Sequence, residues 1–342
     1  MNRHISRITV LGDGAWGTSL ALVLLWNRHD VTLWGPFREN IDAINATGDN
    51  KFLKGVKLPK ELRAEADIAK AVADADLLVL ASPSQYMRKT LDALKLHFRK
   101  EQHRLVDIAK GIETGSLKRM SEICEEILGE SHYAALSGPS HAEEVSRRVP
   151  TAVVIASKEI ELAVELQNLF MNEFFRVYTS DDLTGVELGG ALKNVYAIAT
   201  GMIDGMGLGD NPKAALMTRA IAEMSRLGVM LGGRAQTFSG LSGVGDLIVT
   251  CMSRHSRNRY VGEELGKGRG IDEIIQSMGM VVAEGVKTSE SMCQLAGKIG
   301  VETPVANTIY DIIYRGKAPK DAVLELMTAR RNTKQNDFLF FA

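Results

Sequence analysis

The first half of the chain carries short, continuous apolar runs separated by segments whose apolar residues recur at helical spacing. Residues 8–11 and 77–81 are two such runs. Runs of this kind are typical of strands buried on both faces of a parallel sheet. Because strands and helices alternate, the pattern predicts a doubly wound α/β fold.

The pattern changes at about residue 188, where strand signals stop and helical spacing continues to a last predicted helix at residues 319–329. We therefore expect two domains. The first is an α/β, Rossmann-like, NAD(P)-binding domain at residues 1–188, and the second is an all-α substrate and catalytic domain at residues 189–342. The second ends in a polar tail that closes with the apolar residues 338–341, whose role the sequence leaves open.

A Gly-x-Gly-x-x-Gly motif directly follows the first apolar run and precedes a predicted helix. In this context the motif predicts dinucleotide binding. The first glycine permits a tight turn, the second lets the backbone approach a pyrophosphate, and the third lets helix and strand pack closely. Free N–H groups at the helix start then face the phosphates. The cofactor contacts expected here are Gly12, Gly14, Ala15 and Gly17.

The tip of the second predicted strand, residues 30–34, bears on the cofactor preference. NAD-binding folds usually place an acid there, on the ribose 2′-hydroxyl. No acid follows this strand, and Arg38 is close enough in sequence to meet a 2′-phosphate. This favours NADP(H), with NAD(H) also accepted. In the alternative interpretation, Arg38 is a solvated loop cation.

Two further strand ends carry candidate anion contacts. Lys110 follows the strand predicted at residues 105–109, where it can bind an anion or be an ordinary surface lysine. Ser140 and Glu143 follow the strand at residues 133–136 and match the capping box Ser-x-x-Glu. Such a cap is compatible with an anion site, and equally with a helix start that binds nothing.

In the helical half, Lys193 and Asn194 interrupt an otherwise apolar stripe. A desolvated lysine has a lowered pKa and becomes a usable proton donor near neutrality. Asp246 and Thr250 are four residues apart, so they share a helix face that could meet Lys193. The alternative is a lysine that extends its ammonium group to solvent from the helix edge.

Residues 253–259 contain three arginines among hydroxyl and amide side chains. This composition suits a phosphate group, and a flexible basic loop is the alternative.

Composition narrows the class of protein. Of the 342 residues, 45% are hydrophobic and 24% charged, and the net charge is −1, which argues against nucleic-acid binding. Cys124, Cys251 and Cys293 have no metal or disulfide spacing, as expected for a metal-free protein in a reducing cytoplasm. Neither a targeting segment nor a membrane-spanning apolar run is visible.

Taken together, these motifs make the chain resemble the bacterial NAD(P)-dependent glycerol-3-phosphate dehydrogenases from about Arg7 to Arg330. The motifs that carry the resemblance lie at residues 12–18, 109–113, 137–140, 190–195, 245–247 and 256–258. The resemblance implies reduction of dihydroxyacetone phosphate to sn-glycerol 3-phosphate, a precursor of glycerophospholipids, by a homodimer.

The resemblance also implies residue roles. Lys193 exchanges a proton with the oxygen at C2 of the substrate, and Lys110, Asn194 and Asp246 complete the catalytic set. The implied substrate contacts are Lys110, Gly138, Ser140, Lys193, Asp246, Ser256, Arg257 and Asn258. The implied cofactor contacts are Trp16 in the glycine stretch and Lys110, Ala142, Arg257, Val282 and Glu284 outside it. Arg38 is the further cofactor contact expected from the tip of the second strand. Thr250 matches a position that lines the site in the wider family.

Two positions depart from the family pattern. Asp13 stands where alanine or glycine is usual, and Pro36 stands where many members have arginine or histidine. Two other functions stay open at this point: another dehydrogenase of the β-hydroxyacid or 6-phosphogluconate type, and a sensor that binds NADP without catalysis. The residues 256–258 argue against the first, and the joint presence of Lys110, Lys193 and Asp246 argues against the second.

Overall fold

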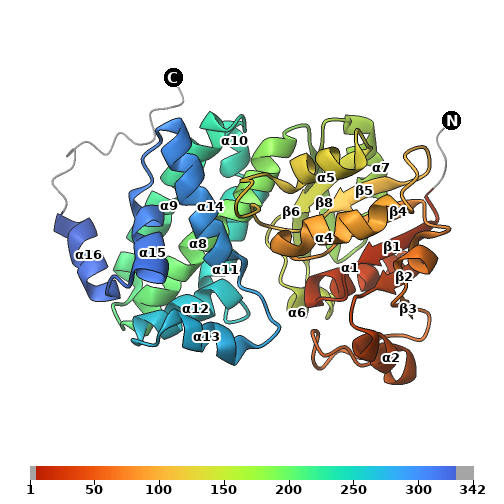
Figure 1. The fold of residues 1–342 in the computed structure, drawn as a ribbon, viewed down its shortest axis with the longest axis horizontal. Helices are drawn as coiled ribbons and strands as arrows, with labels where there is room; N and C mark the ends of the chain where they lie inside the picture. Colours follow the sequence, from red (N-terminus) through yellow and green to blue (C-terminus); the bar gives the residue numbers. More distant parts are fainter. Residues whose placement is uncertain (1–4, 329–342) are drawn as a thin grey trace. The chain divides into compact units, whose positions relative to one another are not determined.

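The computed structural model describes residues 5–328, which fall into two compact units (Figure 1). The first unit consists of residues 5–109 and Lys118–Leu183, and the second of Lys110–Leu117 and residues 184–328. The apolar residues 338–341 lie outside the described part. Between residues 5 and 328, no helix combines the length and apolar character needed to cross a bilayer.

Eight strands of the described chain form one sheet in the first unit, in the order β3-β2-β1-β4-β5-β6-β7-β8. The strands are β1 (Arg7–Leu11), β2 (Asp30–Trp34), β3 (Arg63–Glu65), β4 (Leu77–Leu80), β5 (Arg104–Asp107), β6 (Tyr133–Ser137), β7 (Thr151–Ser157) and β8 (Phe175–Ser180). Neighbouring strands pair in parallel, except that β7 runs antiparallel to β6. The expected doubly wound α/β architecture is therefore confirmed.

The helices of this unit connect the strands. They are α1 (Ala15–Trp26), α2 (Arg38–Thr47), α3 (Ile68–Val72), α4 (Ser84–Lys95), α5 (Met120–Leu128), α6 (Ala142–Val145) and α7 (Ile160–Phe170). The connection through α1 moves to one side of β1 and the connection through α4 moves away in the other direction. Because such crossovers are right-handed, α1 and α4 cover opposite faces of the sheet. Accordingly, α1 packs with α6 and α7, whereas α4 packs with α3 and α5.

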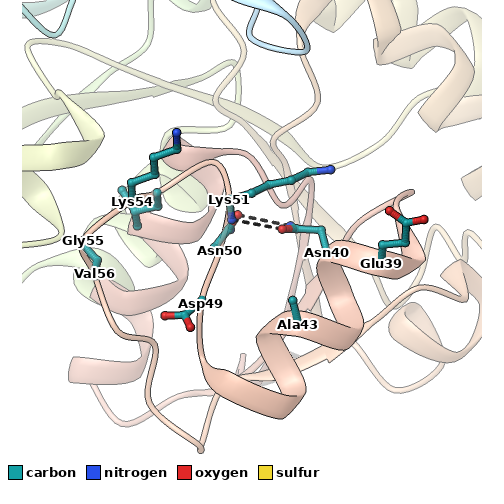
Figure 2. A pocket seen from close by; sticks show the side chains of 10 residues that line it. Glu39, Asn40, Ala43, Asp49, Asn50, Lys51, Lys54, Gly55 and Val56 are labelled. Atoms are coloured by element: carbon teal, nitrogen blue, oxygen red, sulfur yellow. Dashed lines mark hydrogen bonds between the residues drawn. The ribbon is translucent and has the colours of Figure 1, made fainter.

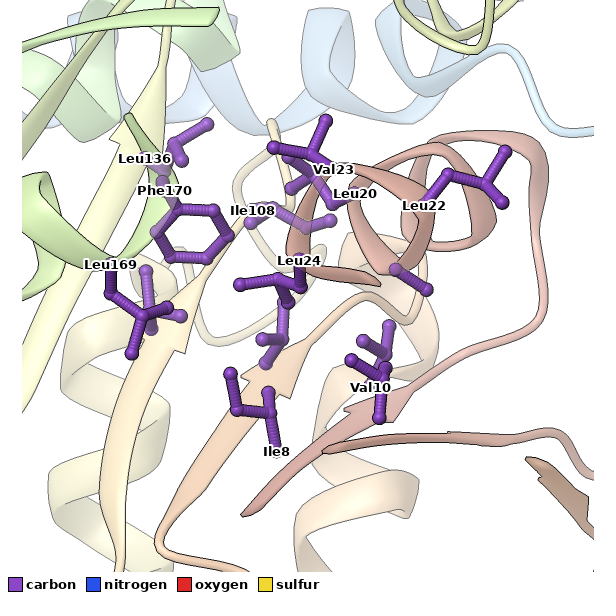
Figure 3. Packing of buried hydrophobic residues seen from close by; sticks show 14 of the residues in the cluster. Ile8, Val10, Leu20, Leu22, Val23, Leu24, Ile108, Leu136, Leu169 and Phe170 are labelled. Atoms are coloured by element: carbon purple, nitrogen blue, oxygen red, sulfur yellow. The ribbon is translucent and has the colours of Figure 1, made fainter. Parts of the chain in front are cut away.

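The core of the first unit lies between the sheet and α1 (Figure 3). Leu20, Val23 and Leu24 project from α1 and are fully buried. They belong to the same apolar cluster as Ile8 and Val10 on β1. This packing holds the start of α1, and with it the glycine turn that precedes it, at the carboxyl end of β1.

The second unit is helical. Its helices are α8 (Leu183–Gly205), α9 (Asp210–Met230), α10 (Ala235–Phe238), a π-helical turn η1 (Leu241–Gly245), α11 (Asp246–Met252), α12 (Arg257–Gly266), α13 (Ile271–Met278), α14 (Glu284–Ile299), α15 (Pro304–Arg315) and α16 (Pro319–Thr328). The pattern change expected at residue 188 falls inside α8, whose first residue Leu183 ends the first unit. Long stretches of α8 are buried, as befits a helix surrounded by others.

Two helices of the second unit approach each other backbone to backbone. A Cβ atom at Gly262 of α12 would collide with the carbonyl of Ile198 on α8, and one at Gly201 of α8 would collide with the carbonyl of Arg259. The absence of side chains at these glycines lets the two helices cross closely. This crossing fixes the first turn of α12 beside the middle of α8, where the candidate site is built.

Candidate active site

Asp246 is the centre of a buried polar cluster in the second unit. It is 1% exposed and is the first residue of α11, directly after the π-helical turn η1. A Cβ at Gly189 of α8 would lie 2.8 Å from the carbonyl oxygen of Ser242, so η1 rests closely on α8. Irregular turns of this kind are frequent at functional sites. Here the turn places a carboxylate against the polar positions of α8.

Two lysines bind the two oxygens of this carboxylate. Lys110 Nζ lies 2.7 Å from Asp246 Oδ2, and Lys193 Nζ lies 2.9 Å from Asp246 Oδ1. Lys193 Nζ also donates to Thr250 Oγ1 at 2.6 Å, and Thr250 Oγ1 donates to Asp246 Oδ1 at 3.2 Å. The spacing of Asp246 and Thr250 on one helix face therefore brings both side chains to Lys193, as the sequence indicated.

Burial controls the charge state of the cluster. Lys193 is 5% exposed, and its burial, with a smaller effect from Lys110, lowers the pKa of its ammonium group to about 8, although Asp246 acts in the opposite direction. Burial alone would raise the pKa of Asp246, but the charges of Lys110 and Lys193 outweigh it and hold that pKa below its ordinary value. An ionised carboxylate between two lysines leaves one excess positive charge, which suits an anionic substrate.

A chain of amide hydrogen bonds connects this cluster to two other helices. Asn194 Nδ2 donates to the carbonyl of Lys110 at 2.9 Å, and Asn258 Nδ2 donates to Asn194 Oδ1 at 2.8 Å. Asn258 Oδ1 in turn accepts the backbone N–H of Gly285 at 2.9 Å. Asn194 and Asn258 are both buried. The network joins the Lys110 segment, α8, α12 and the first turn of α14.

The basic segment at residues 253–259 is partly helical. Ser256 is the N-cap of α12, and its Oγ accepts the N–H of Arg259 at 3.1 Å. Arg257 is exposed in the first turn and neighbours the buried Asn258. Val282 and Glu284 are partly exposed and lie just before and at the start of α14, next to Gly285. Sequence reasoning missed Gly285, because only the fold brings its N–H to Asn258.

The glycine motif lies in the first unit. Gly12 has φ of +141°, and a Cβ at Gly17 would collide with the carbonyl of Gly12. Around a Cβ built on Gly14, by contrast, there is no atom within 4 Å. Gly14 is the N-cap of α1 and no side chain caps this helix. The backbone at Gly14 and the N–H groups at Ala15 and Trp16 therefore form an open cradle that fits a pyrophosphate.

The capping box expected at Ser140 and Glu143 is wrong. The N-cap of the short helix α6 is His141, and Ser140 Oγ donates to the carbonyl of Gly138 at 2.8 Å. Gly138 has φ of +134°, and this bend directs the Ser140 hydroxyl back to the carbonyl rather than forward to the helix. Ser19 Oγ of α1 donates to the carbonyl of Ala142 at 2.9 Å, so this segment adjoins the helix of the glycine motif.

Arg38 is the first residue of α2 and is exposed.

Within residues 5–328, no group of three or more His, Cys, Asp or Glu side chains is arranged to hold a metal ion.

The Rossmann-like sheet with its glycine cradle and the helical unit with its lysine–carboxylate cluster define a two-domain, nucleotide-dependent dehydrogenase. The N-terminal model of the NAD-dependent glycerol-3-phosphate dehydrogenases matches residues 7–163, and the C-terminal model of that family matches residues 182–324. The chain belongs to the NAD-dependent glycerol-3-phosphate dehydrogenase family.

Individual relatives agree with this assignment. A protein of Bacillus thuringiensis (strain Al Hakam), named glycerol-3-phosphate dehydrogenase (NAD(P)+), is 48% identical over 94% of this chain and 96% of its own length. The crystal structure of glycerol-3-phosphate dehydrogenase from Coxiella burnetii superposes with a TM-score of 0.91 at 36% identity, covering 95% of this chain and all of the other. D-mandelate dehydrogenase shares the fold. Its structure superposes with a TM-score of 0.64 at 13% identity, covering 93% of this chain and 99% of its own.

Proposed function

We propose that the chain reduces dihydroxyacetone phosphate to sn-glycerol 3-phosphate with NAD(P)H. The observation that carries this proposal is Lys193, a buried ammonium group with a pKa of about 8 that is bound by Asp246 and Thr250. A general acid works best when its pKa lies near the working pH. Family membership supports the choice of substrate.

The chemistry divides between the cofactor and the chain. NAD(P)H, when bound, supplies the hydride to C2 of the ketone. Lys193 donates one proton to the oxygen at C2, so that the ketone gains one hydride and one proton and becomes the secondary alcohol. Lys110 and Asn194 stabilise the negative charge that develops on this oxygen. Asp246 orients both lysines through its two oxygens.

The phosphate of the substrate needs further contacts. We assign it to the start of α12, where Ser256, Arg257 and Asn258 combine a hydroxyl, a guanidinium group and an amide. Arg257 is the exposed cation of the three and can form a bidentate pair with a phosphate. Gly138 and Ser140 are proposed as further substrate contacts.

The cofactor contacts follow from the glycine cradle and the family pattern. The cradle leaves open space at Gly14, which fits a pyrophosphate. The proposed contacts are Gly12, Gly14, Ala15, Trp16, Gly17, Arg38, Lys110, Ala142, Arg257, Val282 and Glu284. NADP(H) is preferred and NAD(H) is accepted in this proposal.

The proposal extends to the biological setting. The product would supply glycerophospholipid synthesis in the cytoplasm, and the working form would be a homodimer. The proposed domain roles are a cofactor domain at residues 1–188 and a substrate domain at residues 189–342.

One comparison tests the function. NADPH oxidation is measured with dihydroxyacetone phosphate, and NADP+ reduction is measured with β-hydroxyacids and with 6-phosphogluconate. We expect turnover only with the triose phosphate, and a loss of about 10²- to 10⁴-fold in kcat in Lys193→Ala. The control Lys298→Ala removes an exposed lysine of α14 and should leave kcat unchanged. Absence of turnover with dihydroxyacetone phosphate would refute the substrate, and near-normal kcat in Lys193→Ala would refute the proton donor.

A further inference from the structure

The space beside the carboxyl end of β2 is occupied by a side chain from the glycine motif. Gly35 directly follows β2, and a Cβ at this glycine would collide with the carboxyl carbon of Asp13. Asp13 comes from the glycine motif and is 3% exposed. The position after β2 thus bears no side chain of its own, and Pro36 follows it. A cation that faces a nucleotide at this strand tip therefore does not come from residue 35 or 36.

A hydrogen-bond network connects that tip to the loop at residues 49–56. Asp13 Oδ2 accepts from Asn40 Nδ2 at 2.7 Å, and the carbonyl of Asp13 accepts from Asn50 Nδ2 at 2.8 Å. The N–H of Lys51 donates to Asn40 Oδ1 at 3.2 Å. Asn40 lies in the first turn of α2. The network therefore fixes the backbone of Lys51 beside the start of α2, close to the glycine motif.

Two aromatic rings hold the ammonium group of Lys51. Its Nζ lies 4.9 Å from the ring centre of Phe37 and 5.0 Å from that of Phe52, and the two ring centres are 6.3 Å apart. Phe37 is the N-cap of α2, so these contacts bring the charge to the connection between β2 and α2. Cation–π contacts of this kind orient the ammonium group of an exposed lysine.

A cavity of about 470 Å³ opens at the same place, lined by α2 and by the loop at residues 49–56 (Figure 2). Lys51 and Lys54 line it together with the carboxylates of Glu39 and Asp49, and Asp49 is paired with Lys57. Figure 2 shows the two lysine side chains leaving the loop in different directions. Asp13 is buried at the strand tip, and burial raises the pKa of its carboxyl group against smaller lowering effects of the Asn40 hydrogen bond and of the charge of Lys51. Lys51 is exposed, so it presents a positive charge to a ligand there.

In folds with this glycine motif, the adenosine ribose of a dinucleotide lies at the carboxyl end of β2. We propose that Lys51, held between Phe37 and Phe52, binds the adenosine 2′-phosphate of NADP(H) and so determines the preference over NAD(H). This inference rests on the proposed function for the identity of the cofactor. It places the decisive cation on the loop at residues 49–56 instead of at Arg38, whose side chain is exposed at the start of α2.

The test uses the full chain and measures binding without turnover. Isothermal titration calorimetry is performed with NADP+, NAD+, adenosine 2′,5′-bisphosphate and adenosine 5′-monophosphate. In Lys51→Ala we expect about a 10-fold loss of affinity for the two ligands with a 2′-phosphate and less than about a 2-fold change for the other two, because a charge-assisted contact is lost. The loss should shrink at high salt.

Lys54→Ala is the matched control, since it removes an exposed lysine from the same loop and cavity. It should change no affinity by more than about 2-fold, because Lys54 lies outside the aromatic pair. Arg38→Ala is measured in parallel. Equal loss for all four ligands in Lys51→Ala, no loss, or selective loss in Arg38→Ala alone would each overturn the inference while leaving the proposed reaction standing. A wild-type chain that binds neither NADP+ nor NAD+ would overturn both.

Discussion

The carboxylate of Asp246 is the group that keeps Lys193 protonated near neutral pH. Burial lowers the pKa of Lys193 from 10.5 to about 8, and Lys110 adds to this effect. The net penalty on charging Lys193 is about 3 kcal/mol, at about 1.4 kcal/mol for each pKa unit. Asp246→Asn removes the largest attractive charge and leaves both opposing effects in place. We expect the pKa of Lys193 to fall by a further 1 to 3 units, roughly, since this is the usual effect of one adjacent charge.

The consequence for the rate follows from the protonated fraction. In the proposed reaction, ketone reduction needs the protonated Lys193, so kcat/KM should fall as the pH rises through the pKa of this lysine. At pH 7.5, about three quarters of Lys193 is protonated if its pKa is 8, and about 3% if its pKa is 6. Asp246→Asn should therefore lose roughly 25-fold in kcat/KM at this pH from protonation alone, and recover most of that loss near pH 5.5. Oxidation of sn-glycerol 3-phosphate needs the neutral lysine and should show the opposite trend.

The assay is the initial rate of NADPH oxidation with dihydroxyacetone phosphate between pH 5.5 and 9.5. Thr250→Val is the matched control, because it removes the 2.6 Å hydrogen bond to Lys193 without changing a charge. Its pH profile should move by less than about half a unit. The melting temperature and the NADPH affinity show whether each variant is folded. A profile of Asp246→Asn that stays at the wild-type pH, or moves to higher pH, would refute the reasoning.

Three other predictions follow from single residues. Gly17→Ala should lower the melting temperature by several degrees, because its Cβ collides with the backbone of Gly12. The Cβ of Gly14→Ala meets open space, so this variant should keep the melting temperature and weaken NADPH binding in calorimetry. Equal effects of the two variants on melting would contradict the packing. Arg257→Ala should raise KM for dihydroxyacetone phosphate about 10- to 100-fold with a smaller effect on kcat, and an unchanged KM would place the phosphate elsewhere. His103 is fully buried, and burial first, then Arg99, lower its pKa from 6.5 to about 4. Between pH 6.5 and 4 the unfolded chain therefore binds one more proton than the folded chain, so stability falls as the pH is lowered. Urea titrations should show a loss of about 2 kcal/mol in the free energy of unfolding between pH 7.5 and 5. This loss should be absent in His103→Gln.

The fold could be predicted wherever apolar residues carried the pattern. The strands expected at residues 30–34 and 77–81 match β2 and β4 to within one residue, because each is a largely apolar run with clear ends. The strand β3 was missed because Arg63–Glu65 reads Arg-Ala-Glu and gains its structure only by pairing with β2. Likewise, the first turns of α9, which begins at Asp210, carry little apolar periodicity and could not be recognised as helical from the sequence.

The candidate site was likewise predictable in some parts and not in others. The meeting of Lys193 with Asp246 and Thr250 was predictable, because i,i+4 spacing places two side chains on one helix face. The capping box at Ser140 was not a reliable signal, because a positive φ at Gly138 redirects the hydroxyl. Lys51 was invisible to pattern reading, since its aromatic contacts join two loops that only the fold brings together.

The cluster around Asp246 also explains why two lysines are present. Both bind one carboxylate, but through different oxygens and with different burial: the side chain of Lys110 is 14% exposed and that of Lys193 is 7% exposed. Lys193 is enclosed by α8 and α11, which is why its proton is held weakly enough to be donated. Lys110 reaches the carboxylate from the separate segment Lys110–Leu117, whose backbone Asn194 holds at the carbonyl of Lys110. Under the proposed function, burial prepares Lys193 to donate its proton, while Asp246 keeps it protonated and holds the second positive charge of Lys110 beside it.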